Sequence, residues 1–393
     1  MNIELLDLTY YDFYQVLLTA CILILSSTIC LLFARTRIDI IYIFFLYIWH
    51  TVFSYRYYIT TVQGGGDAIV YYRHSIKAAT LVPSPGTEFV KYMTTYFTRG
   101  LGLNYLNTTL VYSLFGAIGL TLFYLSLKKH LKIMPWYWGL IVFLPSLSYW
   151  SSAIGKDAIS FLSVCILLYA VTTAKRKNLL CGISILLMLM VRPHVAFMIV
   201  GSFVFYFIVQ SKAHIILKLI ILPFITFGSI ILLNYATEYA GVDEASVSGV
   251  AEFYDSRQGI NNHGGGGIDT SSMSLPLKVF SYMFRPLPFE ASSLITFIAS
   301  IENSILLLSF IYLIYSARSR LKLLIEGKNL WLTTYVVFAS IILSYGLSNL
   351  GIAARQKWMF MPILIYLLIE AYRYNNSKKM RKYYEVHVNS KPS

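Results

Sequence analysis

The sequence predicts an all-α membrane protein that crosses the bilayer many times. Of its 393 residues, 57% are hydrophobic and only 13% are charged, and the mean hydropathy is +0.63. A water-soluble domain of this length carries far more charge. The apolar residues fall in about eleven runs of a length suited to transmembrane helices, the shorter of which require tilt or burial. We therefore expect one transmembrane domain over residues 1–393.

Each expected helix is an apolar run bounded by polar, glycine-containing or proline-containing connections. In chain order, the runs cover 14–34, 38–60, 106–127, 135–150, 158–174, 179–191, 195–210, 214–236, 294–316, 330–350 and 358–372. We find no internal repeat, so the pattern does not favour an inverted-repeat transporter.

Basic residues gather in alternate connections, which determines the expected orientation. They lie in 35–37, 128–132, 175–177, 211–212, 318–322 and 378–382. The positive-inside rule places these segments in the cytoplasm, with the N-terminus outside and 373–393 as a basic cytoplasmic tail. The formal charge of +14 thus reflects topology. It does not indicate a nucleic-acid-binding surface, which needs basic residues gathered on one water-facing face.

The cysteines and the N-terminus point to no further chemistry. Cys21, Cys30, Cys165 and Cys181 lie inside apolar runs without metal-binding spacing, so we expect small core residues. Residues 1–14 contain no Lys or Arg, which a cleavable signal peptide would require, so we expect the first span to be retained.

The remaining connections are expected outside, and two of them are long. Segment 61–105 contains a proline-rich break and then 88–97, which suits a helix lying at the membrane interface with Tyr92, Tyr96 and Phe97 as anchors. Segment 237–293 contains a glycine-rich stretch that suits a mobile loop. Because most of the unusual chemistry lies in outer connections, we expect the outer loops 61–105 and 237–293 to form the active face.

Asp67 is the first candidate residue, because it follows three glycines that let the backbone approach a ligand closely. It suits a general base or a metal ligand, flanked by Tyr71 and Tyr72. It also suits a cap for a helix that begins at Ala68, and the two roles can coexist.

Two further outer connections carry ionisable residues at the ends of apolar runs. If a helix begins near Asp157, its N-terminus, with Lys156 beside it, favours a phosphate, although a simple Lys-Asp ion pair at a helix end fits as well. Arg192 can bind phosphate bidentately, and His194 can transfer a proton near neutral pH. The structural alternatives are interfacial snorkelling for Arg192 and a hydrogen-bonded core position for His194.

Later outer segments add further candidates, namely Arg257, His263, Asp269, Arg285, Glu290, Arg355 and Gln356. His263 and Asp269 around flexible glycines form only a weak metal signal. Lys156, Arg192, Arg285 and Arg355 are cations that converge on one face from separate helices. Such a set suits an anionic, lipid-linked substrate.

The opening half of the chain resembles a known enzyme family. Arg56-Tyr57-Tyr58, followed by Gly66 to Tyr71, is similar to the Arg-Tyr, Gly-x-Asp and Tyr pattern of EpsG-like and Wzy-like polymerases of bacterial surface polysaccharides, such as O-antigen or capsule. These polymerases are relatives of C-type membrane glycosyltransferases. The resemblance continues in 151–161, where Lys156-Asp157 replaces an Arg-Gln-like pair, and in the second half it rests on topology alone.

The resemblance implies transfer of a growing glycan between polyprenyl-pyrophosphate-linked oligosaccharides, outside the bacterial cytoplasmic membrane. We expect Asp67 to deprotonate the acceptor hydroxyl, with His194 and Glu290 as alternatives. Cations would hold the leaving pyrophosphate, and Tyr71, Tyr72, Tyr149 and Trp150 would stack on sugars. The expected partners are the lipid-linked oligosaccharide, the lipid bilayer and other polysaccharide-export proteins. No nucleotide or redox cofactor is needed, no metal ligand is assigned, and a divalent metal is optional.

Two other functions remain open on the sequence. A flippase for lipid-linked sugar would need polar residues along several helices. The spans hold little beyond Lys218, Asn234, Glu302, Asn303 and Glu370. A glycan ligase or acyltransferase would use the same outer face.

Overall fold

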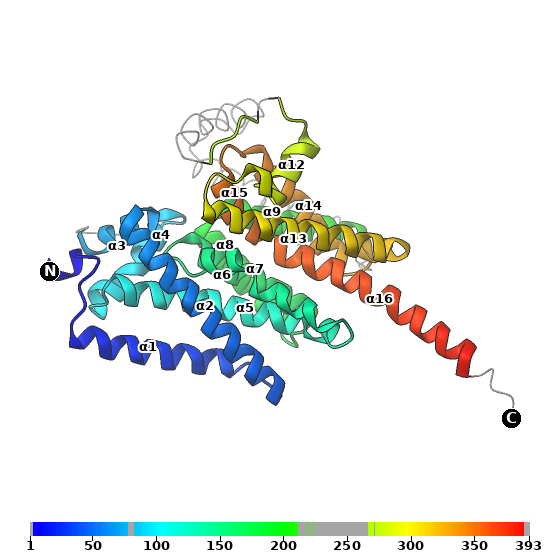
Figure 1. The fold of residues 1–393 in the computed structure, drawn as a ribbon, viewed down its shortest axis with the longest axis horizontal. Coiled ribbons are helices and arrows are strands. Elements are labelled where there is room, and N and C mark those ends of the chain that lie inside the picture. Colours follow the sequence, from blue (N-terminus) through cyan, green and yellow to red (C-terminus); the bar gives the residue numbers. More distant parts are fainter. Residues whose placement is uncertain are drawn as a thin grey trace.

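The structure is a computed structural model that describes residues 3–77, 82–210, 218, 223, 266–270 and 272–388 (Figure 1). The expected span 214–236 lies outside the described residues, except for Lys218 and Pro223. So does the first half of the long outer segment, which includes Arg257 and His263.

Helices account for 81% of the described chain, which contains no strand. The α-helices are α1 (Phe13–Leu31), α2 (Arg37–Gly64), α3 (Asp67–Lys77), α4 (Thr87–Thr95), α5 (Tyr105–Leu131), α6 (Pro145–Trp150), α7 (Lys156–Thr172), α8 (Lys177–Val191), α9 (Pro193–Gln210), α12 (Leu275–Phe284), α13 (Leu294–Ala317), α14 (Asn329–Tyr345), α15 (Leu350–Gln356) and α16 (Met361–Val388). Shorter helical segments are η1 (Ile3–Leu6), η2 (Tyr96–Gly100), η3 (Trp136–Phe143), η4 (Pro288–Glu290), η5 (Arg318–Ile325) and η6 (Lys357–Met359).

The helical class is confirmed, whereas the count of eleven spans is not. Five helical segments in the described chain are long and apolar enough to cross a membrane: α1, α2, α5, α9 and the segment Thr296–Ile325. A sixth arises if α15 with η6 and the first part of α16 count as one broken span, bent by 59°. The helices α8 and α14 are apolar but shorter.

The pattern of buried and exposed residues in α1 indicates that this helix faces lipid. Its buried residues are Gln15, Ser26 and Cys30, while Ile24 and Leu25 are 64% and 61% exposed. In water this distribution would be unfavourable, because apolar side chains would face solvent and polar ones the core. It suits a helix that faces hydrocarbon and uses polar groups to bind its neighbour. Gln15 does so, donating to the Gly102 carbonyl at 2.8 Å.

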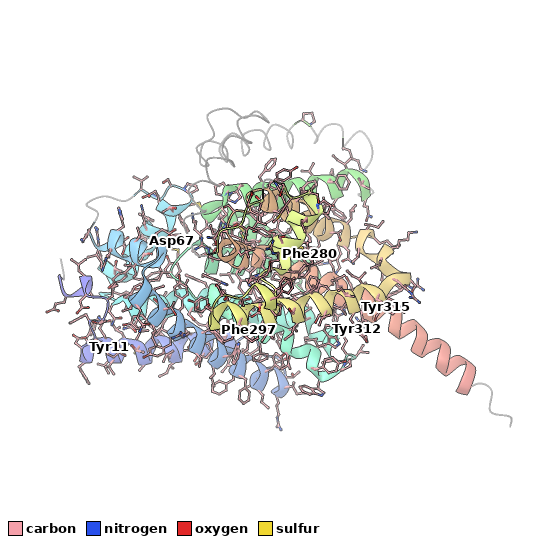
Figure 2. All side chains as sticks on the ribbon, turned by 45° about the horizontal axis from the view of Figure 1, so that its top comes forward. Tyr11, Asp67, Phe280, Phe297, Tyr312 and Tyr315 are labelled. Atoms are coloured by element: carbon pink, nitrogen blue, oxygen red, sulfur yellow. The ribbon has the colours of Figure 1, made fainter. Side chains whose placement is uncertain are left out.

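Aromatic side chains on α13 follow the same logic. Phe297 near its start and Tyr312 and Tyr315 near its end are exposed on the outside of the bundle (Figure 2). Aromatic residues favour the two membrane interfaces. Their positions near both ends of one long apolar helix are those of a membrane-spanning segment.

The centre of the bundle is formed by α5 and α7 (Figure 1). Nearly every side chain of α7 is buried. Ser163 of α7 and Ser184 of α8 each donate to the other's carbonyl, at 2.8 and 2.7 Å. Small polar residues of this kind let membrane helices pack closely.

The expected span 135–150 is wrong. The chain there forms η3 and then the short helix α6, separated by Leu144 with a non-helical ψ of 127°. Leu144 precedes Pro145, and the proline ring excludes the α conformation from the residue before it. Hydropathy alone does not detect this constraint.

Polar contacts gather at two opposite ends of α7. At its far end, Lys328 donates to the Val171 carbonyl at 3.2 Å, and nearby basic connections join the helices. At its start lies Asp157, roughly 21 Å away by the helical rise. The bundle thus has two separate polar ends, and the one at Asp157 collects most of the residues singled out by sequence.

Candidate functional site

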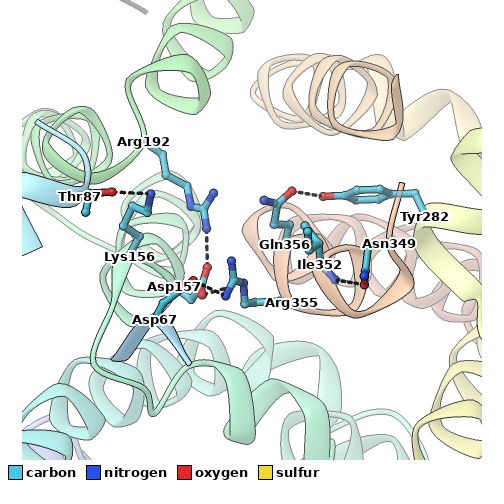
Figure 3. A network of polar contacts seen from close by, with 10 residues as sticks. All are labelled: Asp67, Thr87, Lys156, Asp157, Arg192, Tyr282, Asn349, Ile352, Arg355 and Gln356. Carbon is cyan, nitrogen blue, oxygen red and sulfur yellow. Dashed lines mark hydrogen bonds and ion pairs between the residues drawn. The ribbon is translucent and has the colours of Figure 1, made fainter. Parts of the chain in front are cut away.

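Four charged side chains from four separate segments meet at the start of α7 (Figure 3). Arg192 Nη2 lies 2.6 Å from Asp157 Oδ1. Arg355 Nε lies 3.2 Å from Asp157 Oδ2, and its Nη1 lies 3.3 Å from Asp67 Oδ2. We call Asp67, Asp157, Arg192 and Arg355 the charge cluster.

The glycine run positions Asp67. Gly65 and Gly66 have φ values of 81° and 140°, a region that favours glycine, so the chain turns sharply between α2 and α3. Asp67 is the first residue of α3, where a carboxylate also benefits from the helix dipole. Its side chain is 62% exposed and contacts Arg355. The expected helix start is therefore present, and the carboxylate also takes part in a tertiary contact.

Asp157 is the buried centre of the cluster. It lies in the first turn of α7 after a turn that follows α6, and its side chain is 14% exposed. A carboxylate at this depth is tolerated when opposite charges pair with it, and here two guanidinium groups do so. The neighbouring Lys156 donates to Thr87 Oγ1 at 3.2 Å, which ties α7 to α4.

Arg192 is fixed by the proline that follows it. Pro193 excludes the α conformation at Arg192, so α8 ends at Val191 and α9 begins at Pro193. The side chain of Arg192 is 6% exposed. Its Nε is buried and, among the described residues, has no hydrogen-bond partner.

Arg355 reaches the cluster from the broken end of the last span. The short helix α15 is capped by Asn349, whose Oδ1 accepts from Gly351 N at 2.8 Å. Arg355 lies in the last turn of α15, before the 59° bend that follows η6, and its side chain reaches Asp157 and Asp67 (Figure 3). Within the described chain its buried Nε makes the ion pair with Asp157 but no well-aligned hydrogen bond.

The cluster suits an anionic ligand. With Lys156 it holds three cations and two carboxylates, a net charge of +1 (3 − 2). Guanidinium groups bind phosphate oxygens bidentately. Arg192 Nε is a buried donor without a described partner, whereas Arg355 Nε already faces Asp157 Oδ2 at 3.2 Å.

Arg285 and Glu290 form a separate pair. Arg285 Nε donates to Glu290 Oε1 at 2.7 Å, and Leu287 N donates to Oε2 at 2.7 Å. Burial tends to raise the pKa of Glu290, but these two partners outweigh it and hold that pKa below its ordinary value. A carboxylate with a lowered pKa and both oxygens engaged is a poor general base. The described contacts of this pair do not join it to the charge cluster.

Other predicted residues occupy varied positions. Gln356 accepts from Tyr282 Oη at 3.3 Å beside the cluster (Figure 3). His194 is half-buried in the first turn of α9, two residues beyond Arg192. Tyr71 is 8% exposed and packs against Gly155 at the turn before α7. Tyr72 is fully buried and its ring packs on Tyr105, which does not favour a sugar contact.

Thr87 and Gly116 were missed by the sequence analysis. Thr87 carries no charge, and only the fold brings it to Lys156. A Cβ on Gly116 of α5 would lie 2.2 Å from Ser151 O and 2.6 Å from His50 Nε2. Gly116 therefore permits the turn before α7 to pack directly on α5.

The fold and the cluster define a helical membrane protein with a buried charged site at one end of its bundle. No protein-family model, no curated protein and no solved structure matches the chain. Among the described residues, no group of three or more His, Cys, Asp or Glu side chains is arranged to hold a metal ion.

Proposed function

We propose that the protein is a membrane glycosyltransferase that polymerises polyprenyl-pyrophosphate-linked oligosaccharide repeat units into a surface polysaccharide. The proposal places the charge cluster at the outer face of a bacterial cytoplasmic membrane. The basic connections at the other end of the bundle support this orientation through the positive-inside rule.

The observation that carries the proposal is the unequal environment of the two carboxylates. Asp157 is nearly buried and held by two arginines, so its role is to fix their guanidinium groups. Asp67 is 62% exposed and has one longer contact, at 3.3 Å, to Arg355. An exposed carboxylate beside a partly buried and a buried arginine suits a base that faces an anion-bearing donor.

In the proposed reaction, Arg192, Arg355 and Lys156 bind the pyrophosphate of the donor. The acceptor hydroxyl oxygen attacks the anomeric carbon and its proton passes to Asp67. The bond between that carbon and the pyrophosphate oxygen breaks, and the electron pair leaves on the pyrophosphate. Cations fixed in a water-poor site stabilise this developing charge.

Helix α4, to which Lys156 is hydrogen-bonded, and the adjoining η2 offer tyrosine side chains that suit contact with a sugar. A hollow of about 360 Å³ runs along α4 and η2, and it is lined by Tyr92, Thr95, Tyr96, Arg99 and Gly100. Tyrosine rings give sugar rings an apolar face together with a polar edge. This hollow is a better candidate for sugar contact than the buried Tyr72.

The test is the length of the glycan made by cells that carry variants at matched expression. We expect Asp67→Asn to slow polymerisation by about 100-fold to 10,000-fold, the contribution of a general base. Cells should then accumulate single repeat units on the lipid carrier. Arg192→Ala should give the same product. Glu88→Gln is the matched control, since Glu88 is also an exposed carboxylate, paired at 2.6 Å with Lys91.

Unchanged polymer length in both Asp67→Asn and Arg192→Ala would refute the polymerase assignment. A strain that lacks the protein separates the alternatives. Single-unit products indicate a polymerase, absence of lipid-linked sugar outside indicates a flippase, and full chains stranded on the carrier indicate a ligase.

A further inference from the structure

A second polar network, separate from the charge cluster, is formed by two neighbouring side chains of α13 and their partners. Glu302 Oε2 accepts from Ser146 N at 2.8 Å, and the Ser146 hydroxyl donates to Glu302 Oε1. The next residue, Asn303, accepts from Lys357 Nζ at 2.6 Å and donates to the Pro286 carbonyl at 3.1 Å.

The burial of these side chains is unusual for a membrane helix. Lys357, Asn303 and Glu302 are 1%, 3% and 5% exposed. A charge inside an apolar bundle is costly and is retained where it serves a purpose. The described contacts of the three residues include those with Ser146, with Pro286 and with one another, and they do not reach the charge cluster directly.

Two of the partners, Lys357 and Ser146, belong to segments that lead into the charge cluster. Lys357 lies two residues after Arg355. Ser146 lies in α6, the short helix that precedes the turn before Asp157. Trp358 Nε1 also donates to the Ser146 hydroxyl at 3.2 Å, which joins the two segments directly.

Both segments are interrupted helices, which explains why they need support from outside. The first backbone N–H groups of a helix have no partner within it. Glu302 accepts one of them at the start of α6. The 59° bend after η6 likewise leaves its direction to be set by contacts such as that of Lys357 with Asn303.

We propose that Glu302, Asn303 and Lys357 are positioning residues that form a brace, which sets the distance between Asp157 and Arg355. The catalytic consequence of the brace rests on the proposed function, whereas its mechanical role does not. One continuous helix, α13, holds the segment that leads to Asp157 and the segment that carries Arg355. A displacement of about 1 Å in such a site slows catalysis on the order of 100-fold.

The test compares two buried asparagines, each of which forms a hydrogen bond with a charged side chain. Asn303→Leu removes the contact with Lys357. Asn329→Leu is the matched control. Asn329 is 7% exposed and donates to the Glu370 carboxylate at 2.8 Å, but it lies at the opposite end of the bundle.

The measured quantity is the distance between nitroxide labels at Tyr149→Cys on α6, the segment that leads to Asp157, and Ala354→Cys on α15, in a variant whose native cysteines are replaced. The purified protein in detergent is used, so that the result does not depend on any enzymatic activity. We expect Asn303→Leu and Lys357→Met to shift or broaden the distance distribution and Asn329→Leu to leave it unchanged. Glu302→Gln, which keeps the size of the side chain, provides a milder variant if Asn303→Leu does not fold.

An unchanged distribution in Asn303→Leu and Lys357→Met, or an equal change in Asn329→Leu, would overturn the brace. This outcome is distinct from failure of the polymerase proposal, which is decided by the glycan length of Asp67→Asn. If both proposals hold, Asn303→Leu also slows polymerisation on the order of 100-fold while Asn329→Leu does not.

Discussion

Replacing Asp157 with Asn is the sharpest test of the charge cluster. The carboxylate is 14% exposed and pairs with Arg192 at 2.6 Å and Arg355 at 3.2 Å. Removing one partner of a buried pair leaves uncompensated charge, at a cost of about 3–5 kcal/mol. The free energy of unfolding should fall by that amount, whereas the exposed-pair variant Glu88→Gln should lose about 0–1 kcal/mol.

The same substitution should increase affinity for an anion. It raises the net charge of the cluster with Lys156 from +1 to +2, because one of its two carboxylates becomes neutral. Inorganic pyrophosphate should therefore stabilise Asp157→Asn more than the parent protein. At a ligand concentration of 100 times the Kd, the gain is about 2.7 kcal/mol.

The assay is denaturant unfolding of the purified protein in detergent, followed by circular dichroism, with and without pyrophosphate. Two results would refute the reasoning. A loss below about 1 kcal/mol would show that Asp157 does not neutralise buried charge. Equal stabilisation of the parent and the variant by pyrophosphate would show that the anion binds elsewhere.

Two other predictions concern packing and pH. Gly116→Ala brings a Cβ to 2.2 Å from Ser151 O, so it should lower the free energy of unfolding by about 1–3 kcal/mol and reduce polymer length. Gly182→Ala is the control, because its Cβ meets nothing within 4 Å, and it should leave the free energy of unfolding unchanged or raise it. Because the pKa of Glu290 is lowered by Arg285 in the folded protein, its contribution to stability is present above its ordinary pKa of 4.5 and is lost as the pH falls through the folded value. Unfolding titrations below pH 4.5 should therefore show a shallower decline for Glu290→Gln, and an unaltered slope would contradict the pairing.

The sequence by itself determined the class of the protein and most helix positions. Composition excludes a soluble domain, and a long apolar run becomes a helix because hydrocarbon offers the backbone no other hydrogen-bond partners. The ranges expected for α1, α2, α5, α9 and α13 agree with the structure within a few residues. The failure at 135–150 comes from Pro145, a local backbone constraint that averaged hydropathy does not include.

Only the tertiary structure decided which of the candidate charges act together. Sequence singled out Asp67, Asp157, Arg192, Arg285 and Arg355, since ionisable residues at the ends of apolar runs are costly. It grouped Arg285 with the other cations, yet Arg285 pairs with Glu290 five residues away.

Asp157, by contrast, selects Arg192 from 35 residues away and Arg355 from the last span. Coulomb interactions depend on distance in space and on burial, and neither quantity can be calculated from spacing along the chain. In this cluster, the distances between the charges and their burial follow from the interrupted helices α6 and α15, which Glu302 and Asn303 hold in place.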